Sequence, residues 1–295
     1  MRCNPHNGAR GMRRDGRARA GRTRTMRATR AMRAVMLACA LCVSSVVVRA
    51  LSTPPAVVAA MNNDGKYFDD AALARDHEDF LEHINKSDYD HGKTAVIAAT
   101  MYGHDELLDK LLTMGADGAA LDHDGHSALE FAATLGSVNS LAILKKHGFD
   151  VSALARDGFT PLHRASWGKN ETHLEALKFL VEECGVDVDQ VNSAGTPATL
   201  TAVEHGNLKS LTVLLELGAN ANYMNKRGDT LLALAIRKQD AKVVETLLKH
   251  GANVMTADSK GRNMRKLAKL LRSKEILALI SDAYAAAKKS HGDEL

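Results

Sequence analysis

Side chains suited to metal chemistry gather at residues 122–126, which read Asp-His-Asp-Gly-His. Imidazole nitrogens and carboxylate oxygens bind transition metals, and Asp90 and His91 offer the same pair of side chains further upstream. Charged residues are also what a solvent-exposed turn contains, and the spacing fixes no coordination geometry. We therefore predict that the chain binds no metal ion and no other cofactor.

No pattern in the sequence indicates an active site. A Gly-rich loop leading to Lys-Ser or Lys-Thr, which would bind a nucleotide phosphate, is absent, and so is Gly-x-Ser-x-Gly. Cys3, Cys39 and Cys42 lie in the first 50 residues, which leaves Cys184 alone at the end of an apolar helix. A disulfide scaffold and a cysteine-based zinc site are thereby excluded for the rest of the chain. We predict no catalytic residues and a protein that is not an enzyme.

The net charge of +4 is unevenly distributed along the 295 residues. Residues 1–50 hold 12 of the 39 Lys and Arg residues, all of them Arg, but only one of the 35 Asp and Glu residues. Their net charge is +11, which leaves −7 for the remainder. A nucleic-acid-binding domain needs a basic surface of its own. The acidic remainder therefore indicates a globular part that binds no nucleic acid.

The first 50 residues have the pattern of a targeting leader. An Arg-rich stretch precedes residues 34–48, which are fifteen positions without a charge. A bilayer span needs about 20 apolar residues, whereas this shorter run fits the core of a signal peptide. We predict a signal peptide that is cleaved after Ala50. The alternatives are an uncleaved signal anchor, which would hold the chain at a membrane, and a plastid or mitochondrial import signal.

The last three residues, Asp293, Glu294 and Leu295, resemble the end of the endoplasmic-reticulum retrieval signal. Gly292 departs from the Lys or His that usually precedes them. Together with the leader, this ending predicts a location in the endoplasmic-reticulum lumen, and membrane contact only if the leader is uncleaved.

The strongest pattern is a glycine that recurs every 33 residues, at positions 92, 125 and 158 and again at 195, 228 and 261. The step from 158 to 195 is 37 residues, which is an insertion of four that we place at residues 169–173. A fixed period between 20 and 50 residues is typical of stacked repeats.

Each period has the same internal order. A short run of small and apolar residues follows the glycine, as in residues 94–100 (TAVIAAT) and 127–133 (SALEFAA). A longer segment then carries apolar doublets four residues apart, such as residues 107–108 and 111–112, which form one apolar stripe on a helix. Each period therefore predicts a short helix, a turn and a longer amphipathic helix.

The sequence of these periods resembles the ankyrin repeat. Residues 160–165 (TPLHRA) match the family pattern T-P-L-H-x-A, and residues 115–117 (GAD) and 251–253 (GAN) match its turn. The resemblance covers residues 92–280 and implies an all-α repeat solenoid of helix-turn-helix units with hairpin-like tips. It also implies a structural role for His163, which hydrogen-bonds the neighbouring backbone and a Thr hydroxyl in this family.

Such an array needs caps, because each unit buries its apolar face only against a neighbour. The predicted division is a targeting leader at 1–50, a linker at 51–68, an N-terminal capping helix at 69–91, five ankyrin repeats at 92–260, a C-terminal cap repeat at 261–280 and a tail at 281–295.

The resemblance further implies that the tips and the exposed ends of the short helices form a concave groove for another protein. Three aromatic side chains, Tyr102, Phe159 and Trp167, fall at such positions, and aromatic residues flanked by charge are typical of binding hot spots. The positions carried over from the family are Met101, Tyr102, His123, Asp124, His126, Leu135, Arg156, Phe159, Trp167, Glu204, His205, Lys226, Arg227, Asp229 and Arg237.

The sequence thus predicts a non-enzymatic protein-interaction adaptor of the secretory pathway. The alternatives are a membrane-anchored adaptor and an adaptor or chaperone of a plastid or mitochondrion. The identity of the partner protein is not encoded in these patterns.

Overall fold

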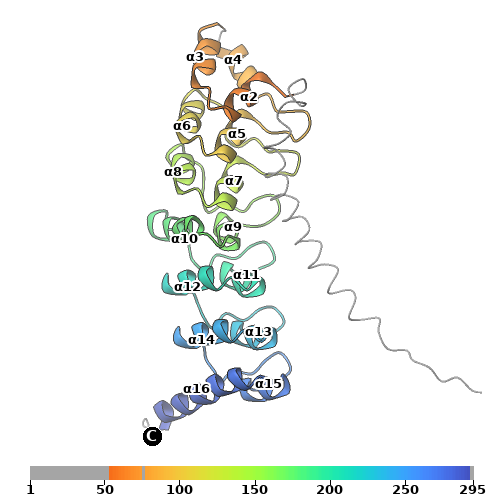
Figure 1. Cartoon of the computed structure of the whole chain (residues 1–295), viewed down its shortest axis with the longest axis vertical. Coiled ribbons are helices and arrows are strands. Elements are labelled where there is room, and N and C mark those ends of the chain that lie inside the picture. Colours follow the sequence, from red (N-terminus) through yellow and green to blue (C-terminus); the bar gives the residue numbers. More distant parts are fainter. Residues whose placement is uncertain (1–52, 75–76, 293–295) are drawn as a thin grey trace, which may run out of the picture. The chain divides into compact units, whose positions relative to one another are not determined.

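The computed structural model describes residues 53–74 and 77–292, which are almost entirely helical. Their helices alternate between two columns (Figure 1). The inner column, next to the loops, contains α5 (Ala95–Tyr102), α7 (Ala128–Leu135), α9 (Pro161–Trp167), α11 (Ala198–His205), α13 (Leu231–Lys238) and α15 (Met264–Leu270). The outer column contains α6 (Asp105–Thr113), α8 (Val138–Lys146), α10 (Glu171–Lys178), α12 (Leu208–Glu216), α14 (Ala241–Lys249) and α16 (Lys274–Gly292). Each helix packs against its pair mate and against the next helix of its column, which confirms the predicted all-α repeat solenoid.

Local signals in the sequence limit each inner helix to about two turns. The Thr94 hydroxyl oxygen accepts a hydrogen bond from the Ile97 N–H and caps the start of α5. Gly103 follows the helix with a φ of 70°, a left-handed conformation that ends it and that glycine adopts without strain. Ser127, Thr160 and Thr230 start α7, α9 and α13 in the same way as Thr94.

Inner and outer helices differ in how they are buried. Residues 95–100 of α5 are all buried, because neighbours cover this helix on both sides as well as from behind. In α14, by contrast, Val244 and Leu247 are buried while Lys242 and Glu245 are exposed. The core is therefore one continuous layer between the two columns, and its inner side consists of small residues that let helices approach closely.

The four-residue insertion lies in an outer helix, and our placement of it at residues 169–173 is wrong. The spacing from Gly158 to the start of α10 equals the spacing from Gly125 to the start of α8, whereas α10 continues into the π-helical turn η1 (Phe179–Glu183). Four extra residues would rotate the end of an α-helix by about 40°. A π-helical turn, with i→i+5 bonds, rotates less per residue. Leu180 accordingly stays buried.

The N-terminal segment is more structured than the sequence predicted. The predicted linker at 51–68 contains α2 (Pro55–Met61) and the start of α3 (Gly65–Ala74), and α4 (His77–Ile84) follows. Helix α5 is therefore covered by α2, against which α3 and α4 pack, and not by one helix at 69–91.

Burial explains why α2 forms. Ala56, Val57, Ala59 and Ala60 are buried, and α2 packs against α5. The sequence AVVAA at 56–60 is nearly that of AVIAA at 95–99, so α2 occupies the inner column ahead of α5 as an extra member of the stack.

The C-terminal cap is also longer than predicted. Helix α16 continues to Gly292, through most of the segment predicted as a tail. Ile276 and Ile280 are buried on its inner side, and Arg265 of α15 lies 5.6 Å from the centre of the Tyr284 ring. The predicted leader and the terminal Asp-Glu-Leu lie outside the described residues. Among the residues described here, no helix combines the length and the apolar character that crossing a bilayer requires.

His163 has the structural environment that the resemblance implied. Its side chain is fully buried, with Nδ1 2.7 Å from the Thr160 hydroxyl oxygen and Nε2 2.8 Å from the Thr196 carbonyl oxygen. A neutral ring that accepts from the hydroxyl and donates to the carbonyl satisfies both contacts. Burial lowers the pKa of His163 below its ordinary value of 6.5, although the bond to Thr196 acts in the opposite direction.

Replacing Val57 with alanine tests the packing of α2. We expect this change to lower the free energy of unfolding by about 2 kcal/mol, because it removes two buried carbons and leaves a cavity. Val58→Ala is the control, since Val58 is only partly buried and should lose less. Urea denaturation of both variants gives the comparison, and equal losses would contradict the description of α2 as part of the stack.

Acid should destabilise the array through His163. Because its folded pKa lies below the unfolded value of 6.5, the unfolded chain binds the proton more readily, and stability declines as the pH falls through that value. His163→Gln should be less stable by about 1–3 kcal/mol at pH 7.5, since buried polar groups lose partners. It should also lose less stability than wild type between pH 7.5 and 5.5. Thermal melts at both pH values measure this, and identical pH dependence in the two proteins would rule out the assignment.

Candidate protein-binding site

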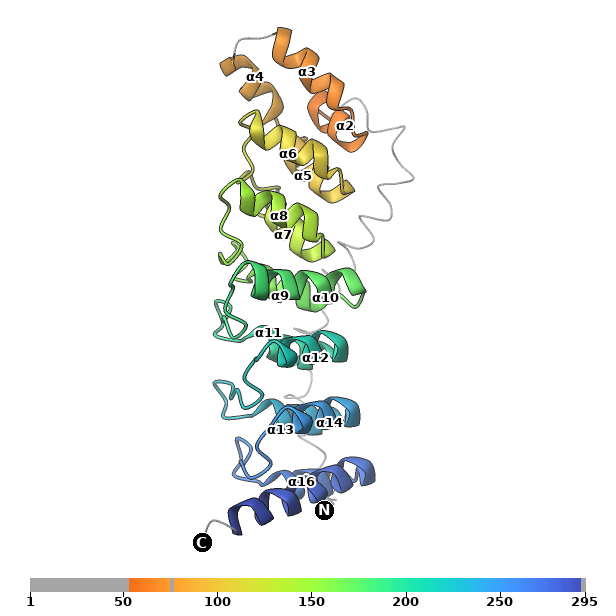
Figure 2. The ribbon, with the colours of Figure 1, turned by 90° about the vertical axis from the view of Figure 1, so that its left-hand side faces the viewer.

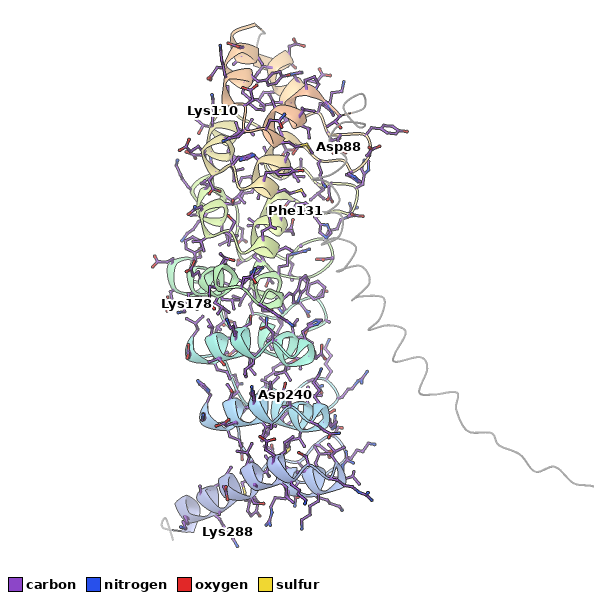
Figure 3. The ribbon with its side chains drawn as sticks, in the orientation of Figure 1. Asp88, Lys110, Phe131, Lys178, Asp240 and Lys288 are labelled. Carbon is purple, nitrogen blue, oxygen red and sulfur yellow. The ribbon has the colours of Figure 1, made fainter. Side chains whose placement is uncertain are left out.

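The loops between successive repeats form tips on one side of the stack (Figure 2). We define the tips as residues 88–93, 122–126, 155–159, 192–196, 225–229 and 258–262. Figure 3 shows Asp88 on this side and Lys110 and Lys178 on the opposite, outer-helix side. We call the surface formed by the tips and the C-terminal ends of the inner helices the inner face.

A polar side chain at the first position organises most tips. The Asp122 carboxylate oxygen Oδ1 accepts the backbone N–H groups of Asp124 at 3.0 Å and His126 at 2.8 Å. Asn192, Asn225 and Asp258 make the same two bonds in later tips. Because the first residue holds the turn, the next two side chains are directed to solvent.

The same contacts explain the cluster that resembled a metal site. Ligand atoms of Asp122, Asp124 and His126 lie within 4.8 Å of one another. However, the Asp122 oxygen already serves two backbone donors, and Asp124 is exposed. The arrangement is that of an organised turn, and the absence of a metal site stays a prediction.

The predicted aromatic residues of the third repeat pack against each other. The Phe159 and Trp167 rings meet edge to face with their centres 5.0 Å apart, and Arg164 lies 5.7 Å from the centre of the Trp167 ring. Both rings are half-buried, and Arg164 donates to the Asp157 carboxylate at 2.8 Å. This cluster presents part of its surface outward and uses the rest for packing.

Asp229 and Arg237 have a role inside the array that differs from the predicted surface role. Asp229 is buried, hydrogen-bonds Arg237, and accepts the Ser259 N–H of the next tip at 2.9 Å. The Arg237 guanidinium holds the pKa of Asp229 well below its ordinary value, although burial acts in the opposite direction. These two residues therefore join the last two tips.

A similar arrangement fixes the sixth tip. Burial tends to raise the pKa of Asp258, but hydrogen bonds from Arg262 outweigh it and bring the pKa to about 2. The carboxylates of Asp229 and Asp258 therefore bind groups within the stack.

The other predicted positions divide by exposure. Those that are exposed are Tyr102, His123, Asp124, Leu135, Arg156, Glu204, His205, Lys226 and Arg227, and those that are half-buried are Met101, His126, Phe159, Trp167 and Arg237. Several of them are the last residue of their inner helix. These last residues, Tyr102, Leu135, Trp167, His205, Lys238 and Leu270, form what we call the terminal column. Neighbouring members belong to adjacent packed helices, whose axes lie about 8–10 Å apart.

A second column was missed by the sequence analysis. The residue directly before each tip is large, apolar and exposed in four consecutive repeats, with exposed fractions of 43% for Leu121, 53% for Leu154, 44% for Val191 and 51% for Met224. We call these four residues the tip column. The signal that could have found it is the repetition of a large apolar residue before a polar turn, where solvent would favour a polar one.

Comparison with known proteins places these features in a family. The family model described as "Ankyrin repeats (3 copies)" matches residues 26–155, 98–192 and 162–258, which together exceed half of the chain. The ankyrin repeat domain of Bcl-3 is similar in fold, with a TM-score of 0.62 and 24% identity over 77% of this chain and 97% of that one. An ankyrin repeat domain from Acinetobacter baumannii AYE has a TM-score of 0.56 and 29% identity over 68% of this chain and 98% of that one.

Curated relatives match shorter segments. Mouse NF-kappa-B inhibitor delta is 39% identical over 87 residues, which are 29% of this chain and 27% of that protein. Mouse protein phosphatase 1 regulatory subunit 12A is 40% identical over 75 residues, which are 25% of this chain and 7% of that protein. The matches thus span about a quarter or less of these relatives. Given the family match over most of its length and the stacked helix pairs, the chain belongs to the ankyrin repeat family.

Proposed function

We propose that this chain is a protein-interaction adaptor that binds a partner protein on its inner face. The observation that carries the proposal is the pair of exposed columns. The tip column and the apolar start of the terminal column place large apolar side chains in solvent at equivalent positions of successive repeats. Repeated exposed apolar groups on one surface are typical of a protein-binding site.

The inner face is also suited to binding because it is fixed in advance. Most tips are held by an Asp or Asn side chain at the first position, so the exposed side chains beside it have little backbone freedom to lose. Preorganisation of this kind reduces the entropy lost on association. The names of the relatives, an NF-kappa-B inhibitor and a phosphatase regulatory subunit, support binding rather than catalysis as the activity to test.

A partner protein that binds the terminal column should bind more weakly when the apolar side chains of this column are truncated to alanine. Tyr102 and Leu135 are 37% and 38% exposed, so Tyr102→Ala/Leu135→Ala should lower the free energy of unfolding by about 1 kcal/mol per site and leave the stack folded. Loss of two hot-spot contacts should weaken binding at least about tenfold. Quantitative affinity capture from the native cells measures the partners retained.

Met255→Ala is the matched control, since Met255 is 48% exposed and lies in neither column. Partners retained by wild type and Met255→Ala, but lost from the double variant, would support the proposal. The same partners on all three proteins would argue against it. Trp167→Ala is a poor probe, because the Trp167 ring also packs on Phe159.

We further propose that the adaptor acts in the lumen of the endoplasmic reticulum. The uncharged run at 34–48 and the terminal Asp-Glu-Leu support this location. Cleavage after Ala50 would leave the stack whole, since α2 begins at Pro55. A membrane-anchored form and a plastid or mitochondrial form are the alternatives.

The start of the mature protein distinguishes these locations. We expect N-terminal sequencing of protein from native cells to begin at Leu51, and an internal tag to localise with an endoplasmic-reticulum marker. An intact leader would favour the membrane-anchored form. A plastid or mitochondrial signal would refute the proposed location.

A further inference from the structure

The charge of the stack changes sign along its length. Residues 53–221 contain 12 Lys and Arg residues and 26 Asp and Glu residues, a net charge of −14. Residues 222–292 contain 15 Lys and Arg residues and six Asp and Glu residues, a net charge of +9. The last third of the stack is therefore strongly basic beside an acidic remainder.

Five exposed cations of this region gather around the last two tips and the start of α15. They are Lys226, Arg227, Lys260, Arg265 and Lys266, and we call them the basic end. Among the described residues, none of the five takes part in an ion pair. The cations of the nearby ion pairs are Arg237, Lys249 and Arg262. The side-chain contact seen for the basic end is that of Arg265 with the Tyr284 ring.

Capping alone does not account for this charge. A terminal repeat needs a polar outer face. Arg265 and Lys266 provide part of it, because they occupy the positions that Leu162 and His163 have in the third repeat, where both side chains are buried. A polar face for solubility alone is usually built from charges of both signs. Moreover, Lys226 and Arg227 belong to an internal repeat that needs no cap. The uniform sign therefore points to a ligand of opposite charge.

We propose that the basic end binds an acidic, extended segment of a partner protein. The inference rests on the proposed protein-binding function and names the chemistry of the partner. Adjacent repeats are about 10 Å apart, the span of about three residues of extended chain. Acidic residues at every third position would therefore meet successive tips. Met224, which is 51% exposed at the base of the fifth tip, adds an apolar contact within the same surface.

A protein segment fits this surface better than a nucleic acid. A long polyanion that continued past the basic end would run alongside the part of the stack whose net charge is −14, and like charges repel. Base stacking needs exposed rings, whereas Tyr223 and Tyr284 beside the basic end are both half-buried, Tyr284 beneath Arg265. A short acidic segment avoids both difficulties.

The test uses the full chain and a fluorescein-labelled peptide of five Glu-Ser-Gly units, with a Gln-Ser-Gly peptide of equal length as the neutral control. Fluorescence anisotropy measures both affinities at low and physiological salt. The variant Lys226→Gln/Arg227→Gln/Lys260→Gln removes three charges from the basic end. The matched control, Lys86→Gln/Lys169→Gln/Lys178→Gln, removes three exposed charges elsewhere, including Lys178 on the outer-helix side (Figure 3).

We expect the Glu peptide to bind more tightly than the Gln peptide, and the affinity to fall as salt rises. The basic-end variant should bind it about tenfold more weakly, as three lost surface ion pairs would give. The control variant should change the affinity less than about twofold. If the triple variant melts at a lower temperature than wild type, the single variant Arg227→Gln replaces it in the test. We expect this single variant to show a smaller loss of affinity for the Glu peptide.

Three outcomes would overturn the inference. They are equal binding of the two peptides, equal losses in the two triple variants, and tighter basic-end-dependent binding of phosphatidylserine vesicles or duplex DNA than of the Glu peptide. Failure here is separable from failure of the proposed function. If a partner protein is lost from Tyr102→Ala/Leu135→Ala but still binds the basic-end variant, the proposed adaptor function stands and the inference of an acidic partner segment fails.

Discussion

The inner helices from α5 to α13 have no solvent-exposed polar face, and the rest of the structure follows from that constraint. Residues 95–100 of α5 are buried on every side, so this helix is stable only between two neighbours and an outer helix. The later members α7, α9, α11 and α13 are buried in the same way except near their last residues. The stack must therefore continue until a helix with an exposed side can end it, which α2 to α4 do at one end and α16 does at the other.

Polar contacts keep neighbouring repeats in register while apolar contacts hold them together. The His123 N–H donates to the His91 carbonyl at 2.8 Å, and the Ser193 N–H donates to the Gly158 carbonyl at 2.9 Å. His163 reaches the Thr196 carbonyl of the next repeat in the same manner. Each of these bonds fixes the position of one tip relative to the next, so the exposed side chains occur at regular intervals.

The sequence predicts the repeat, the helix pairs and the role of His163, because glycine spacing and the TPLH motif report local backbone geometry. It is less informative where burial depends on context. The sequence predicts a linker over residues 56–60, because a short apolar run has no helical period, and only the contact of these residues with α5 explains their helix. The predicted place of the insertion is wrong because an alignment of repeats only counts residues. It does not show that a π-helical turn takes up extra residues inside a helix.

The candidate site is predictable only in part for a similar reason. Family positions identify side chains near the tips, but they do not show that Asp229 turns inward to Arg237 or that Phe159 and Trp167 cover each other. The tip column, in turn, is visible only once the exposure of Leu121 and its equivalents is known. Exposure and pairing between repeats are three-dimensional properties that a single period does not contain.

In most tips the residue that holds the turn is not one of the residues that are exposed to solvent, and this separation has an evolutionary consequence. Asp122 holds its turn through backbone donors alone, so the identities of His123 and Asp124 have no part in folding. Mutations at these two positions can accumulate without selection against unfolding. Recognition can thus diverge quickly between descendants of this chain while the scaffold that carries it is inherited unchanged.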